Sequence, residues 1–98
     1  MSKPVACRVS IRGRVQGVGF RAYVEHVALT HGIEGWVRNR RDGSVEAVFA
    51  GPAETVKAAI EACRHGPGGL TAIDEFPAGP DDVSRRYSGE LFSVLPTT

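Results

Sequence analysis

The stretch from Gly13 to Arg21 constrains this chain most, because it joins a segment with strand periodicity to a segment with helical periodicity. Its glycines, Gly13, Gly17 and Gly19, allow the backbone to turn tightly with N–H groups facing inward. The helix that follows adds the partial positive charge of its N-terminus, and Arg21 adds a planar fork of donors. The sequence therefore predicts a strand, a tight turn and a helix that together form a seat for an anion such as phosphate.

The spacing of apolar residues predicts the other elements. Apolar and polar residues alternate from Val5 to Arg12, which is typical of a strand with one buried face. Helical spacing runs from Phe20 to Ala28, before Gly32, and again from Val56 to Cys63. The expected strands are 5–11, 33–38, 44–50 and, less legibly, 70–76 and 91–95, with a hairpin turn at 39–43 and helices over about 20–31 and from after residue 52 to near residue 66.

This element order predicts the fold class. The order β-α-β-β-α-β is that of an α+β, ferredoxin-like split βαβ sandwich, in which two helices cover one face of an antiparallel sheet. The pattern leaves open whether Leu91–Leu95 adds a short fifth strand. With 98 residues, 42% of them hydrophobic, residues 1–98 can close one core, so we expect a single domain.

Charge is distributed unevenly along the chain. Residues 1–43 hold eight Lys/Arg against three Asp/Glu, and residues 44–98 hold four against eight. The excess of positive charge around the glycine run favours a small anionic ligand and falls short of the basic stripe of a duplex-binding protein. Arg38, Arg40 and Arg41 are interpreted as solvated hairpin residues, or as charges that steer anions toward the loop.

Compartment, cysteines and metal binding follow from composition. No apolar stretch approaches the roughly 20 residues that span a bilayer, and the N-terminus lacks the apolar core of a signal peptide, so we expect a cytoplasmic protein without membrane contact. Cys7 and Cys63 fall at core-facing positions and are expected to stay reduced. The histidines are scattered and no C-x-x-C pair exists, so no metal or other cofactor is expected.

Asn39, at the end of the second predicted strand, is the second candidate for chemistry. In a split βαβ unit the third strand lies between the first and the second, so Asn39 should face the glycine loop. A carboxamide can hold a water molecule but is too weak a base to deprotonate it. Taken alone, Asn39 is more simply explained as a residue that tolerates positive φ before a turn.

Two segments of the chain resemble the two signature motifs of the acylphosphatases: residues Ile11 to Arg21, and residues Gly35 to Val45 with the later Gly51. The resemblance is strong from about residue 5 to residue 66. It implies a metal-free hydrolase that splits the carboxyl-phosphate anhydride bond of acyl phosphates to give a carboxylate and inorganic phosphate. We expect this hydrolase to act as a monomer. Arg21 would bind the phosphoryl group and Asn39 would orient the attacking water. The phosphate cradle would be formed by the main chain of Val15, Gln16, Gly17, Val18, Gly19, Phe20 and Arg21.

Alternatives from other classes remain open at this stage. RNA-recognition modules share the element order, and the segment from Gly17 to Tyr23 loosely resembles their aromatic signature, although here that segment opens a helix. A non-catalytic phosphate-sensing domain would keep the cradle and Arg21 but would not need Asn39. Phe20 and Trp36 are expected to belong to the core, and no nucleic-acid partner is expected.

Overall fold

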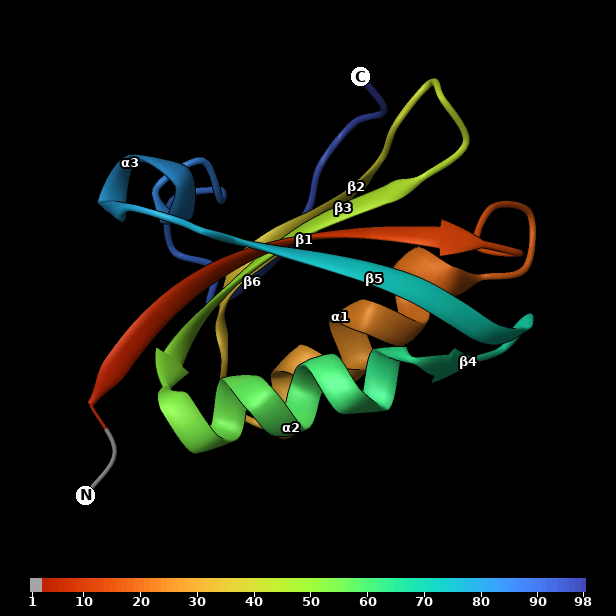
Figure 1. Ribbon diagram of the computed structural model, residues 1–98. Helices are drawn as coiled ribbons and strands as arrows, with labels where there is room; N and C mark the ends of the chain where they lie inside the picture. Colours follow the sequence, from red (N-terminus) through yellow and green to blue (C-terminus); the bar gives the residue numbers. More distant parts are fainter. Residues whose placement is uncertain (1–2) are drawn as a thin grey trace.

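The computed structural model describes residues 3–98, which form a twisted six-stranded sheet with two long helices on one face (Figure 1). The strands lie in the order β4-β5-β1-β3-β2-β6. The elements are β1 (Pro4–Gly13), α1 (Phe20–Thr30), β2 (Glu34–Asn39), β3 (Val45–Pro52), α2 (Ala53–Cys63), β4 (His65–Gly66), β5 (Gly69–Pro77), α3 (Pro80–Val83) and β6 (Phe92–Val94). The ferredoxin-like α+β prediction is confirmed, with β3 between β1 and β2 as expected.

The sheet differs from the prediction at its edges. β6 pairs with β2 in parallel, so the sheet is mixed rather than purely antiparallel. The region between β5 and β6, for which the sequence predicted no element, contains the short helix α3, and Gly66 lies in the two-residue strand β4. Each of these elements has at most four residues, which is too short for a hydrophobic period to reveal it.

The main core lies between the sheet and helices α1 and α2. Alternate residues of β1, such as Val9 and Ile11, are fully buried there, and Phe20 is 1% exposed. The same alternation predicted Val5 and Cys7 to be buried, but Val5 is 40% exposed and Cys7 is half-buried, because a pocket remains between them and α2. Cys63 is buried as predicted, and burial raises the pKa of its thiol to about 12.

The opposite face of the sheet carries a smaller apolar cluster. Trp36, Val48 and Leu95 are buried there, with Ala78 and Val83 packed against them. The indole Nε1 of Trp36 donates a hydrogen bond of 2.6 Å to the main-chain oxygen of Asp82. In Figure 1, α3 accordingly lies across the sheet from α1 and α2. Trp36 is thus a core residue as predicted, but of the second face.

No helix in residues 3–98 is long and apolar enough to cross a membrane.

Candidate active site

The turn between β1 and α1 has the backbone geometry of an anion-binding concavity. Gly17 has φ 77° and Gly19 has φ 76°, whereas Val18 between them has a negative φ. A φ that alternates in sign along the chain can direct successive N–H groups toward one side. Gly19 also serves as the N-cap of α1, so the turn leads directly into the first helical turn.

The N–H groups of this turn are available to a ligand. Within residues 3–98, the main-chain N–H groups of residues 16–20 donate to no acceptor, and the first hydrogen bond of α1 runs from Tyr23 N to Gly19 O, at 3.0 Å. Val15 differs, because its N–H donates to Gly13 O at 3.0 Å and its side chain is 1% exposed. The Val15 main chain and side chain thus secure the start of the loop, and the free donors begin at Gln16.

Arg21 is the second residue of α1 and is half-buried. In the described part of the chain Arg21 takes part in no ion pair, whereas Arg8 and Arg12 of β1 and Arg38 of β2 each do. A cation at a helix N-terminus is opposed by the partial positive charge of that end. An anion bound at the loop would reverse this unfavourable interaction.

Asn39 ends β2, and its side chain lies on the same face as that of Val37, which belongs to the helix-side core. Its Oδ1 atom is buried and has no hydrogen-bond partner in the region described. The main chain of Asn39 is held on both sides: it pairs with Val45 of β3, and Asn39 O accepts a hydrogen bond of 3.1 Å from Thr98 N. An unpaired buried acceptor costs about 1–3 kcal/mol, so this oxygen would gain from any donor that reaches it.

The structure brings the glycine loop and the β2–β3 hairpin together, as the topology predicts. The side-chain nitrogen Nε2 of Gln16 donates to Arg40 O at 2.8 Å and to Ser44 O at 2.9 Å. Arg40 is the neighbour of Asn39 in the chain. In Figure 1 the loop after β1 and the hairpin between β2 and β3 project from the same end of the sheet.

A buried carboxylate secures the hairpin from the other face of the sheet. Glu46 is 6% exposed and accepts hydrogen bonds from Arg38 Nε at 2.7 Å and from Arg40 at 3.1 Å, with Arg8 at 3.4 Å. Burial of Glu46 would raise its pKa, but its hydrogen bonds with Arg38 and Arg40 outweigh burial and hold the pKa below the ordinary value. Arg38 is therefore not the solvated residue that the sequence indicated, since its side chain is 15% exposed.

The sequence contained a signal for this cluster that our prediction did not use. A hairpin closed by residues 40–44 pairs position 38 with position 46, and the register is indeed Arg38 opposite Glu46. Opposite charges at directly paired positions of antiparallel strands attract one another. The contact of Thr98 with Asn39, by contrast, has no local signal in the sequence.

We expect Glu46→Gln to lower stability at neutral pH and to reduce the acid sensitivity of the protein. Because the pKa of Glu46 is below its ordinary value of 4.5 in the folded state, its stabilisation is complete above pH 4.5 and is lost as the pH falls through the folded-state pKa. Loss of charge-assisted hydrogen bonds should reduce the free energy of unfolding by about 1.5–3 kcal/mol at pH 7, and the deficit should shrink below about pH 4. Urea unfolding at several pH values measures both effects.

The matched control for this variant is Glu34→Gln, which removes a carboxylate from the same sheet. Glu34 pairs with Arg86 at 2.7 Å, but its side chain is 49% exposed. An exposed ion pair contributes about 0–1 kcal/mol, so this variant should stay close to the wild type. A Glu46→Gln deficit that is equal at acid and neutral pH would contradict the assignment.

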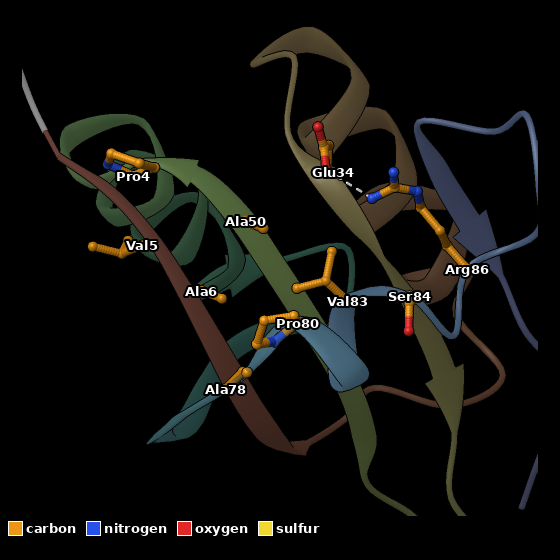
Figure 2. A pocket seen from close by; sticks show the side chains of 11 residues that line it. Pro4, Val5, Ala6, Glu34, Ala50, Ala78, Pro80, Val83, Ser84 and Arg86 are labelled. Carbon is orange, nitrogen blue, oxygen red and sulfur yellow. Dashed lines mark hydrogen bonds and ion pairs between the residues drawn. The ribbon is translucent and has the colours of Figure 1, made fainter.

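A separate pocket of about 440 Å³ lies between α3 and the sheet, away from the glycine loop (Figure 2). Small apolar side chains such as Ala6, Ala50 and Val83 line it, and the ion pair of Glu34 and Arg86 closes one side. The positive charge of Arg86 in this pocket is thus already neutralised by the carboxylate of Glu34. Within residues 3–98, no three His, Cys, Asp or Glu side chains gather as metal ligands would.

Comparison with known proteins identifies the family to which this loop and hairpin belong. A model of the acylphosphatase family matches residues 7–93. The chain belongs to the acylphosphatase family. The acylphosphatase of Rhodopseudomonas palustris strain BisB18 is 56% identical over 92 residues, which cover 92% of this chain and 93% of that protein. The acylphosphatase of Bradyrhizobium diazoefficiens is 55% identical over 92 residues, with the same coverage.

Solved structures of acylphosphatases share the fold of this chain. The crystal structure of acylphosphatase from Bacillus subtilis superimposes with a TM-score of 0.78 at 34% identity and covers 93% of this chain and 98% of that one. The structural similarity thus includes the C-terminal third of the chain, which lies beyond the two sequence motifs. The resemblance predicted from the two motifs is confirmed at the level of the family.

Proposed function

We propose that this protein is an acylphosphatase that hydrolyses the carboxyl-phosphate bond of acyl phosphates to a carboxylate and inorganic phosphate. The observation that carries the proposal is the row of N–H groups at residues 16–20, which has no acceptor in the described chain and leads into Arg21. Family membership agrees with this substrate class. The acyl group would extend away from the loop, since the loop N–H groups would bind only the phosphoryl oxygens.

Binding of the phosphoryl group follows from the donors of the loop. The N–H groups of Gln16, Gly17, Val18, Gly19 and Phe20 would contact its oxygens, and the Arg21 guanidinium would form a two-pronged, charge-assisted contact. These donors neutralise charge that spreads over the equatorial oxygens in the transition state. The proposed reaction therefore includes no metal ion, and addition of a chelator should leave the rate unchanged.

Asn39 supplies the position of the nucleophile. The Asn39 carboxamide would hydrogen-bond a water molecule and direct the water oxygen at phosphorus, opposite the acyl oxygen. The water oxygen forms the new P–O bond, while the bond to the acyl oxygen breaks and its electron pair leaves on the carboxylate. The proton of the water passes to a phosphoryl oxygen or to solvent. A carboxylate is a good leaving group, so alignment can replace a strong base.

One chain supplies every group in this scheme. The loop, Arg21 and Asn39 all belong to residues 13–39, and Gln16 ties the loop to the hairpin within the same molecule. We therefore propose that the monomer is the active unit. The segment from Gly17 to Tyr23, which resembled an RNA-binding signature, lies in the loop and in α1 rather than on a central strand.

The test is hydrolysis of benzoyl phosphate by the purified protein, followed by the ultraviolet absorbance of the substrate. We expect turnover without added metal, unchanged by a chelator and inhibited by inorganic phosphate. p-Nitrophenyl phosphate, which requires expulsion of a phenolate, serves as the control and should react far more slowly. Binding of inorganic phosphate without turnover would instead identify a phosphate-sensing domain, and binding of RNA at physiological salt would identify a nucleic-acid module.

A further inference from the structure

The side chain of Gln16 connects the glycine loop to the β2–β3 hairpin by two hydrogen bonds. Its Nε2 atom carries two hydrogens, and both are used: one is donated to Arg40 O at 2.8 Å and the other to Ser44 O at 2.9 Å. The opposite amide orientation would place Oε1 against two carbonyl oxygens, so the contact fixes the orientation of the side chain. Of the side chains of residues 14–19, that of Gln16 alone forms hydrogen bonds to another part of the described chain.

The two acceptors are the residues that close the hairpin. Arg40 N donates to Ser44 O at 2.8 Å, and Gly43 N donates to Arg40 O at 3.1 Å. Asp42 Oδ1 further accepts hydrogen bonds from Ser44 N at 2.9 Å and from Ser44 Oγ at 2.6 Å. Gln16 is therefore attached to a rigid part of the hairpin, directly beside Asn39.

Gln16 is also the first residue after Val15 whose main-chain N–H has no acceptor in the described chain. Val15 and Phe20 anchor the two ends of the loop in the core, each 1% exposed, whereas Gln16, Gly17 and Gly19 are exposed. Between those anchors, Gln16 gives the loop its hydrogen-bonded link to the strand that carries Asn39. Val18 packs against the core, whereas the direct side-chain hydrogen bonds from the loop to the hairpin beside Asn39 come from Gln16.

We propose that Gln16 is a positioning residue that holds the phosphate loop in register with Asn39. This inference rests on the proposed function, because alignment of water with phosphorus is the property that Gln16 would control. A displacement of about 1 Å in a reacting group can cost about 10²-fold in rate. Binding of phosphate should depend on Gln16 much less, since the loop amides and Arg21 remain in place.

The informative variant is Gln16→Met, which keeps the length of the side chain and removes both donors. We expect kcat for benzoyl phosphate to fall about 10- to 100-fold, while the inhibition constant of inorganic phosphate changes less than about threefold. The midpoint of thermal unfolding should stay close to that of the wild type, because the Gln16 side chain lies at the surface. Gln16→Ala provides a second variant in case the methionine variant does not fold.

A double-mutant cycle of Gln16 and Asn39 distinguishes an effect of Gln16 on the position of Asn39 from a general loss of order in the loop. If Gln16 acts through Asn39, Gln16→Met should reduce kcat by less than about threefold when Asn39 is already alanine. Equal losses in both backgrounds, or a Gln16→Met enzyme within twofold of the wild-type kcat, would overturn the inference. The proposed function is judged separately, by whether the wild type hydrolyses benzoyl phosphate at all.

Discussion

Alanine in place of Arg21 should reduce kcat/KM for benzoyl phosphate by about 10²- to 10⁴-fold. Charge-assisted hydrogen bonds contribute about 1.5–3 kcal/mol each, and a guanidinium fork can make two with a phosphoryl group. Arg21 has no ion-pair partner in residues 3–98, so its removal leaves no protein carboxylate unpaired there. The loss should therefore appear in ligand binding, with weaker inhibition by inorganic phosphate as well as slower turnover.

Two further variants sharpen this test. Arg21→Lys keeps the charge without the planar fork, so we expect an activity between those of the wild type and the alanine variant. Arg85→Ala removes the same charge from an exposed position after α3 and controls for the change in net charge. If Arg21→Ala binds inorganic phosphate as tightly as the wild type, the phosphate seat lies elsewhere.

Asn39→Ala should lose about 10²–10³ in kcat and keep most of the affinity for inorganic phosphate. The carboxamide is proposed to hold the attacking water rather than the phosphoryl group, so its removal affects the transition state more than the bound ligand. Kinetics with benzoyl phosphate and inhibition by inorganic phosphate, measured on one preparation, resolve the two quantities. A variant with wild-type kcat would remove Asn39 from the mechanism.

Stability gives an independent readout for the same variant. The Oδ1 atom of Asn39 is buried without a partner among the described residues, at a cost of about 1–3 kcal/mol. Its replacement by alanine should leave the midpoint of thermal unfolding unchanged or raise it. A residue that is kept at a cost to stability and is needed for turnover is typical of an active site.

Much of the site could be predicted from local sequence because its parts are local. Gly17 and Gly19 have the positive φ angles that a tight turn into a helix requires, and α1 begins at Phe20 as predicted. The hairpin turn at Asp42 and Gly43 likewise depends on a few neighbouring residues, and Gly43 has φ 94°. Such features are specified within about five residues, where backbone sterics decide the conformation.

Other features depended on contacts between distant segments. The parallel pairing of β6 with β2, the position of α3 over Trp36 and the hydrogen bond from Thr98 to Asn39 join residues far apart in the chain. The side chain of Gln16 belongs to this group, since its partners at Arg40 and Ser44 follow 24 and 28 residues later. The sequence placed Gln16 in the loop but did not indicate what its side chain would bind.

By itself, the amino-acid sequence determined the order of the longer helices and strands and the conformation of the glycine loop. Those properties follow from backbone sterics and from hydrophobic period, which act over one or two turns of chain. Only the tertiary structure decided that Gln16 links the loop to the hairpin, that Glu46 gathers three arginines, and that Asn39 Oδ1 is buried without a partner. Hydrogen bonds depend on atomic positions to within tenths of an ångström, and those positions are set when the whole core packs.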